Sequence, residues 1–218
     1  MAVVPLVLEG PNANVVESQE AFASARGPNG DSILIQNLDR EQLLDIQRTN
    51  ISYDLRVGEL YRDHRDQGSY ELHADQELIL RPGAAVIVQT EEIVHLPKTM
   101  FGHIVPKVSL LQKGLSNTSS KVDPGYPGPL LITVFNLGKR RVSLKRGDKF
   151  CCLYILEVSG LARPYGGDRK RILGTAKRHW LDYVFDYLES RTGAVHAALI
   201  FVTLLLLIEE LFDHIFRR

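Results

Sequence analysis

Short apolar runs alternate with turn residues through the middle of the chain. From Ile51 to Val158 these runs are rich in Val, Ile, Leu, Tyr and Phe, and each is about as long as one β-strand. Turn sequences separate them at Arg81-Pro82-Gly83, Leu96-Pro97, Asp123-Pro124-Gly125 and Arg146-Gly147-Asp148. Many short strands at close spacing predict a mainly β fold, with an antiparallel barrel or jelly-roll over 51–160 rather than βαβ units.

The residues before the predicted barrel differ from it in composition. Within 1–50, residues Met1–Asp31 mix Gly, Pro, Asn and Ser, which predicts a surface arm with a helix-like piece at Glu17–Ala25. A short helix is predicted at Leu38–Arg48, where the apolar residues approach helical spacing and Asp39 is a candidate N-cap.

The residues after the barrel predict C-terminal α-helices. In 161–190 a basic, Gly-rich linker leads into an amphipathic helix at Lys177–Ser190. In 191–218, Ala194–Ile208 is apolar on all sides apart from two residues and approaches the ~17-residue lower limit for a transmembrane helix. We therefore predict that this helix anchors the protein to a membrane. A bundle of three such helices in an oligomer is the alternative.

Composition narrows the partners and the compartment. The 26 basic and 26 acidic residues give a formal net charge of zero, which argues against a nucleic acid polymer as partner. Cys151 and Cys152 are adjacent and would point to opposite faces of a strand, so a disulfide between them is disfavoured. A reducing, cytoplasmic location is expected. The apolar N-terminus lacks a basic start and a full h-region, so no signal peptide is predicted.

The stretch Pro106–Asn136 carries the strongest functional signal. Two apolar runs flank a polar middle that offers cations, an amide, a carboxylate and an aromatic face, from Lys107, Lys113, Asn117, Asp123 and Tyr126. Such a set suits a phosphorylated ligand that bears a base. Each residue alone has an ordinary alternative: a turn for the aspartate, core packing for the tyrosine, and solvated surface for the lysines.

Four motifs occur in order along the barrel region. They are SYDLRVG (Ser52–Gly58), PKVSLLQKGL (Pro106–Leu115), NTSSKVDPGYPG (Asn117–Gly128) and RGDKFCCLYIL (Arg146–Leu156). Together they resemble motifs of the dUTPase/dCTP deaminase superfamily. The resemblance implies a dUTPase-like jelly-roll that forms a homotrimer with deoxynucleoside triphosphate sites between subunits. It also implies Mg²⁺ carried on the nucleotide phosphates rather than on protein ligands.

The resemblance gives roles to individual residues. Asp123 would be the general base that activates water, and Tyr126 would pack under the sugar and select deoxyribose. The other predicted nucleotide-binding residues are Lys107, Ser109, Gln112 and Asn117. Lys107 stands where the family has an arginine, so the bidentate phosphate contact is lost.

The departures from the pattern decide between reactions. Val108 replaces a phosphate-binding serine, Gln112 replaces the deaminases' arginine, and Cys152 replaces a glutamine. Thr133 replaces the glutamate that transfers protons in deaminases, so deamination by the family mechanism is disfavoured. The main hypothesis is hydrolysis of dUTP or a related triphosphate to the monophosphate and pyrophosphate. The alternatives are a nucleotide-sensing module that signals through the C-terminal helix and a deaminase with a rebuilt site.

Overall fold

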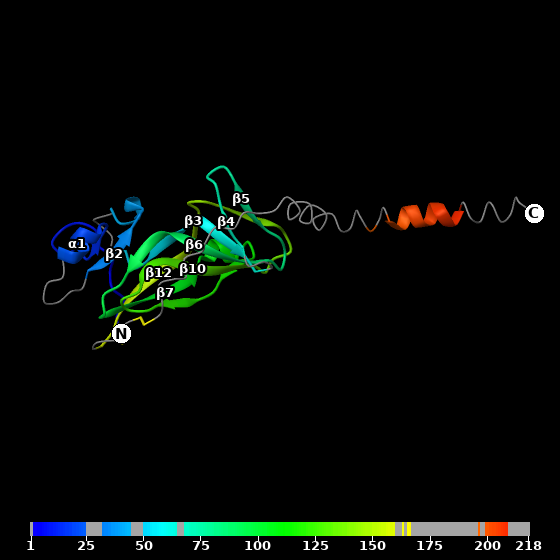
Figure 1. Cartoon of the computed structure of the whole chain (residues 1–218). Coiled ribbons are helices and arrows are strands. Elements are labelled where there is room, and N and C mark those ends of the chain that lie inside the picture. The colour runs from blue at the N-terminus through cyan, green and yellow to red at the C-terminus, as the bar shows by residue number, and fades with distance from the viewer. Residues whose placement is uncertain are drawn as a thin grey trace, which may run out of the picture. The chain divides into compact units, whose positions relative to one another are not determined.

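A computed structural model of the chain describes residues 2–24, 32–44, 50–64, 68–159, 163, 165–166, 196 and 199–208. The chain divides into two units, Met1–Ala176 and Lys177–Arg218. The strand-rich barrel lies in the first unit (Figure 1).

The first unit is mainly β, as predicted. Its strands are β1 (Val15–Val16), β2 (Ile33–Gln36), β3 (Tyr53–Asp63), β4 (Ser69–Glu71), β5 (Glu77–Leu80), β6 (Ala85–His95), β7 (Met100–Pro106), β8 (Leu115–Asn117), β9 (Ser120–Val122), β10 (Pro127–Asn136), β11 (Val142–Lys145) and β12 (Lys149–Glu157). The helical pieces are α1 (Gln19–Ser24), a 3-10 turn η1 (Arg40–Gln42) and α2 (Val108–Leu111).

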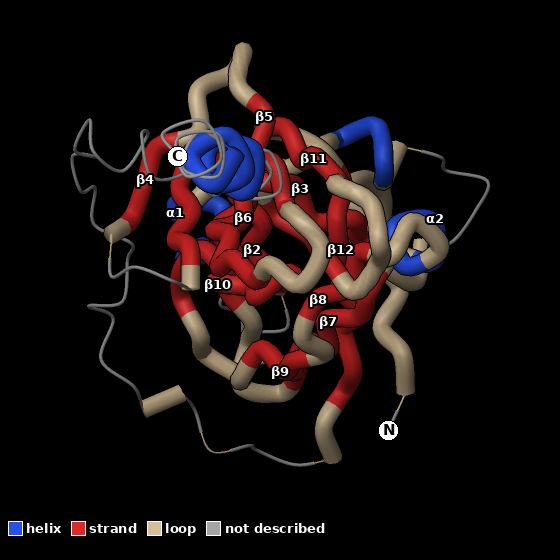
Figure 2. The backbone as a smooth tube through the Cα atoms, turned by 90° about the vertical axis from the view of Figure 1, so that its right-hand side faces the viewer, coloured by secondary structure: helices blue, strands red, loops and turns tan. Residues whose placement is uncertain are grey.

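The strands wrap around one core. Ten of the described strands join in a path of order β1-β2-β6-β3-β12-β7-β9, with β10, β8 and β4 attached beside it, while β5 and β11 pair separately. All pairings are antiparallel except β1 with β2. Side chains alternate between the core and the outer face, as the burial pattern of β6 shows. Figure 2 shows α2 outside the strands, near β8.

Strand β3 is the corner of this wrapped sheet. Its first half pairs with β12 and its second half pairs with β6, with a register shift after Val57. Gly58 lies at the shift, where an added Cβ would fall 2.7 Å from the backbone oxygen of Gln89. Only glycine allows the two backbones to approach this closely.

The N-terminal residues are more ordered than the predicted surface arm. Leu6 and Val15 are buried in the core, and Val3 bridges to Leu156 of β12. Apolar side chains in this polar stretch therefore contribute to the barrel. The helix-like piece is confirmed as α1 within the described residues.

The helix predicted at Leu38–Arg48 is shorter than expected. The chain forms only the single turn η1, and residues 45–49 lie outside the described ranges. Asp39 precedes the turn but its side chain makes no cap hydrogen bond. Instead its carboxylate contacts Lys149 at 2.9 Å, and this contact lowers the pKa of Asp39. Tertiary contacts thus replace the local helical signal.

The predicted C-terminal helices fall mostly outside the described ranges. Lys177–Ser190 is not covered, whereas 199–208 is helical with all ten side chains exposed. Among the helices in the part of the chain that the structure describes, none has both the length and the apolar character needed to cross a membrane.

Candidate functional site

The end of β7 brings three of the four motifs together. The Lys107 ammonium forms an ion pair with Asp54 of β3, and Cys152 Sγ of β12 donates a hydrogen bond to Asp54 Oδ1 at 3.0 Å. Cys152 is the register partner of both Asp54 and Val105, so adjacent strands place these groups on one face. The sequence prediction included Lys107 but gave Asp54 no site role. Its position in the first motif was the signal that could have identified it.

Two further contacts hold Asp54 in place. The Gln42 side chain accepts from the Asp54 backbone N–H at 2.8 Å and donates to its carbonyl oxygen at 3.0 Å. One amide side chain thus satisfies both backbone groups of a residue at the edge of the sheet. The carboxylate is therefore fixed by the backbone as well as by its ion pair.

The predicted phosphate-binding residues on α2 lie just beyond Lys107. Ser109 is exposed in this short helix, and Gln112 is exposed at its C-cap. Val108 is also exposed, so the position that lacks the expected hydroxyl faces solvent. Lys107, Ser109 and Gln112 thus form a local group at the end of β7.

The other predicted residues lie between β8 and the start of β10: Asn117 ends β8 and is opposite Val134 of β10, whereas Asp123 and Tyr126 lie between β9 and β10. Asn117 is 6% exposed and its Nδ2 donates to the carbonyl oxygen of Thr118 at 3.1 Å. Asp123 follows β9 directly, and its Oδ1 lies 2.8 Å from the Lys121 ammonium. Its carboxylate is 35% exposed and therefore reachable by water or ligand. Lys121 was not among the predicted site residues.

Tyr126 is held in a fixed orientation. Its hydroxyl donates to the carbonyl oxygen of Pro129 at 2.6 Å, and its ring packs edge-on against Tyr165 with ring centroids 5.1 Å apart. Burial raises the pKa of the Tyr126 phenol. Tyr165 is itself bonded to the turn between β9 and β10, because its N–H donates to Pro124 O at 2.8 Å. No site role was predicted for Tyr165, although it follows the strand region closely.

Within one chain, the predicted phosphate-binding residues that begin at Lys107 lie far from Asp123. Val122 of β9 pairs with Gly102 near the start of β7, whereas Lys107 follows its last residue. At ~3.3 Å per residue, this puts Asp123 and Lys107 roughly 20 Å apart along the strand. A single copy therefore places these two groups of predicted residues, each of which would be a half-site, at opposite ends of β7.

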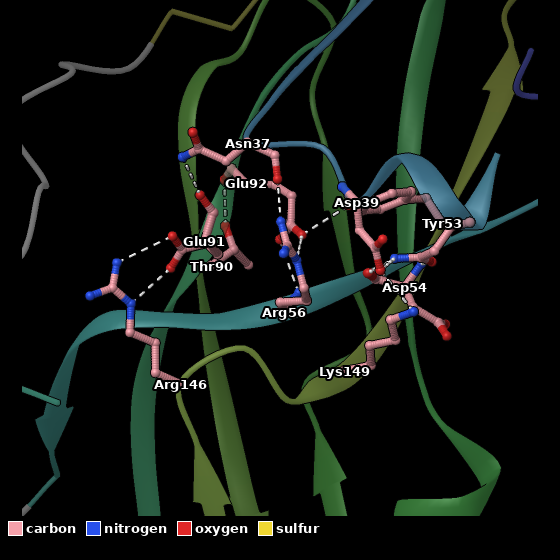
Figure 3. Close-up of polar contacts among 11 residues, drawn as sticks. Asn37, Asp39, Tyr53, Asp54, Arg56, Thr90, Glu91, Glu92, Arg146 and Lys149 are labelled. Atoms are coloured by element: carbon pink, nitrogen blue, oxygen red, sulfur yellow. Dashed lines mark hydrogen bonds and ion pairs between the residues drawn. The ribbon is translucent and has the colours of Figure 1, made fainter. Parts of the chain in front are cut away.

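A buried charge network supports the strand that carries Asp54 (Figure 3). The fully buried Glu92 carboxylate accepts from Arg56 Nε at 2.7 Å, the Arg56 N–H at 2.9 Å and the Tyr53 hydroxyl at 3.0 Å. Burial raises the pKa of Glu92, and the Arg56 contacts oppose that rise. The Tyr53 hydroxyl also accepts from the Asp39 N–H at 2.7 Å, which ties η1 to β3.

A cavity of about 280 Å³ lies beside Glu91, which lines it together with Asn37 and Thr90. Its polar lining includes Glu59, Glu91 and Arg146, whose guanidinium bridges the two carboxylates. None of the predicted site residues lines it.

The pKa of the Cys152 thiol depends in part on its contact with Asp54. Burial, followed by the hydrogen bond to Asp54, raises the pKa of Cys152 from 9.0 to about 12. A raised thiol pKa means that the folded state holds the proton more tightly, so this group's contribution to stability is present below pH 9 and is lost as the pH rises toward 12.

Alkylation of Cys152 by iodoacetamide at pH 8 should therefore be slow in the folded protein. Asp54→Asn removes the negative charge that disfavours the Cys152 thiolate. Because the thiolate is the reactive form, this substitution should accelerate alkylation by about tenfold or more. Mass spectrometry after timed quenching measures the rate. Cys152→Ser is the control, since Cys151 is fully buried. An unchanged rate in Asp54→Asn would show that the carboxylate does not protect the thiol.

Comparison with known proteins gives one consistent family. A family model described as dCTP deaminase-like matches residues 25–158. The chain is 32% identical to a dCTP deaminase of Natronomonas pharaonis over 131 residues, covering 59% of this chain and 67% of the relative. It is 32% identical to a dCTP deaminase of Thermococcus kodakarensis over 143 residues, covering 62% of this chain and 84% of the relative.

Solved structures show a weaker likeness. The 2'-deoxycytidine 5'-triphosphate deaminase of Agrobacterium tumefaciens aligns with a TM-score of 0.48 and 19% identity, over 63% of this chain and 46% of that chain. The EIAV dUTPase aligns with a TM-score of 0.37 and 23% identity, over 55% of this chain and 98% of that chain.

Proposed function

The chain belongs to the dCTP deaminase-like family, and from this premise we propose that it binds a deoxynucleoside triphosphate and hydrolyses it. One observation carries the proposal: the Asp123 carboxylate is accessible, while position 133 holds a threonine in place of a proton-transferring glutamate. The carboxylate can accept a proton from water, whereas a threonine hydroxyl is a poor proton carrier at neutral pH. Hydrolysis therefore fits the residues present better than deamination does.

The proposed reaction follows from the position of this carboxylate. Asp123 takes a proton from a water molecule, and the resulting hydroxide attacks the α-phosphorus. The bond from the α-phosphorus to the bridging oxygen breaks, and pyrophosphate leaves with that oxygen. The product is the deoxynucleoside monophosphate, with dUTP as the main candidate substrate.

Nucleoside recognition is assigned to the segment from β8 to the start of β10. Asn117 would pair with the base edge through its amide oxygen and the second Nδ2 hydrogen, since the first is bonded to the Thr118 carbonyl. The Tyr126 ring, fixed by Pro129 and Tyr165, would support the sugar from below. A fixed ring leaves little space for a 2′-hydroxyl, which favours deoxyribose.

The Mg²⁺ implied by this reaction would be held mainly by the nucleotide. Within the described residues, no group of three or more His, Cys, Asp or Glu side chains could hold a metal ion. The partly exposed Asp123 carboxylate supplies oxygens of the kind Mg²⁺ prefers, so it fits as a contact to an ion carried on the phosphates, whereas both Asp54 oxygens already contact Lys107 and Cys152. Bound there, the ion would neutralise phosphate charge.

A complete site is proposed to require a second copy of the chain. The half-sites at the two ends of β7 are too far apart to contact one nucleotide within a single copy. The outer face between them carries partly exposed apolar side chains, including Phe101 and Val105 on β7 and Tyr154 on β12. Packing this face against other copies in a homotrimer would cover it and join unlike half-sites.

Deamination of dCTP is the second candidate, because the relatives above carry that name. It would require another group to replace the proton transfer lost at Thr133. The position of Thr133 on β10 is well defined, since its carbonyl accepts from the Thr118 N–H at 2.9 Å.

One experiment separates these functions. The purified full-length chain is incubated with each deoxynucleoside triphosphate and Mg²⁺, and the products are resolved by ion-exchange chromatography. Monophosphate with pyrophosphate supports hydrolysis, and dUTP formed from dCTP supports the deaminase. Binding without any product supports the nucleotide-sensing module. Absence of binding for all four nucleotides and dUTP would contradict the proposal.

Membrane association of 191–218 is a separate proposal, supported by the exposed apolar side chains of 199–208. We expect the full-length chain to sediment with membranes and a truncation after Ser190 to remain in the supernatant. Fractionation by ultracentrifugation measures this. A full-length chain in the supernatant would contradict the anchor.

A further inference from the structure

Lys121 of β9 and Asp123, which directly follows this strand, form an ion pair. They are two residues apart, so their side chains leave the extended backbone on the same side. The lysine side chain is 71% exposed and its ammonium lies 2.8 Å from Asp123 Oδ1. The proposed general base therefore has its own adjacent cation.

The other half-site offers a triphosphate the exposed ammonium of Lys113, just after α2, but its other contacts are weakened. The Lys107 ammonium is already paired with Asp54, and Val108 lacks the hydroxyl expected at its position. The triphosphate approaching Asp123 would meet a carboxylate of like charge. A cation beside that carboxylate would offset the repulsion.

We propose that Lys121 is a phosphate-binding residue of the nucleotide site, whose ammonium contacts the phosphate chain next to Asp123. This inference rests on the proposed function. An exposed lysine–carboxylate pair contributes little to stability, so the ammonium can turn toward a phosphate at little cost. Its flexible stem and compact charge suit a contact that forms only when ligand arrives.

The test compares Lys121→Met and Lys121→Arg in the full-length chain. Lys145→Met is the matched control, because Lys145 is also an exposed lysine paired with a carboxylate, that of Glu77 at 3.0 Å. It lies on β11, in the separate two-stranded sheet. Isothermal titration calorimetry measures the dissociation constants of deoxyuridine and of its α,β-imido triphosphate, which resists hydrolysis.

Lys121→Met should raise the dissociation constant of the triphosphate analogue by ~10-fold or more, as expected for loss of a charge-assisted contact. Its dissociation constant for deoxyuridine should stay unchanged. Lys121→Arg should retain most of the triphosphate affinity, and Lys145→Met should match the wild type. Thermal unfolding should confirm that each variant remains folded.

Two results would overturn the inference while leaving the proposed function intact. One is that Lys121→Met binds the triphosphate analogue as tightly as the wild type does. This includes the case in which only turnover falls, because Lys121 would then position Asp123 without contacting the phosphates. The other is an equal loss of affinity for deoxyuridine and the triphosphate. If the wild type binds no deoxynucleotide, the proposed function itself is wrong and the inference fails with it.

Discussion

Asp123→Asn is expected to lower turnover of the deoxynucleoside triphosphate by ~10²-fold or more and to leave its dissociation constant close to the wild-type value. The substitution keeps the size of the side chain and removes the oxygen that accepts a proton. The Asp123 side chain is partly exposed at the end of β9, so the fold should tolerate the change. Initial rates of pyrophosphate release, together with calorimetric binding, measure both quantities.

Asp75→Asn is the matched control, because Asp75 is an exposed turn aspartate between β4 and β5. It should turn over at the wild-type rate. Wild-type turnover in Asp123→Asn would exclude this carboxylate as the base. A loss of binding equal to the loss of turnover would assign it to ligand contact instead.

Glu92→Leu is expected to lower the free energy of unfolding by about 3–5 kcal/mol. The carboxylate is fully buried and accepts from Arg56 and Tyr53, so its removal leaves a guanidinium and a hydroxyl without their partner. Urea unfolding followed by far-UV circular dichroism measures the change.

The neighbouring Glu91 provides the control. Its carboxylate faces the Arg146 side of β6 and is partly exposed, so Glu91→Leu should cost only about 0–1 kcal/mol. The double variant Glu92→Met with Arg56→Met should recover much of the lost stability, since both members of the pair are then replaced. If Glu91→Leu and Glu92→Leu lowered the free energy of unfolding equally, burial of the Glu92–Arg56 ion pair would not explain its effect on stability.

The fold was predictable because strand signals are local. Alternating apolar residues and Asp-Pro-Gly or Arg-Gly-Asp turns fixed the strand-rich region without reference to distant contacts. The predicted length of the Leu38–Arg48 helix was wrong because distant contacts determine the structure of this segment. Gln42 bonds to Asp54 and Asp39 bonds to Lys149, and neither partner is visible in a local window.

The candidate site was predictable only in part. The motifs identified Lys107, Asp123 and Tyr126 as residue types suited to a nucleotide, but their arrangement depends on strand register. Register places Lys107 beside Asp54 and separates it from Asp123, which sequence spacing does not show. The Tyr126–Tyr165 contact was missed because the two rings are far apart in the chain.

The separation of the two half-sites along β7 has a genetic consequence. If each site is shared between copies, a chain with a defective Asp123 still contributes a working Lys107 to a neighbour's site. Two alleles that are inactive alone, one defective at each position, could then restore activity when expressed together. Conversely, one allele defective at both positions would disable sites that its wild-type neighbours help to form, and its phenotype would be dominant.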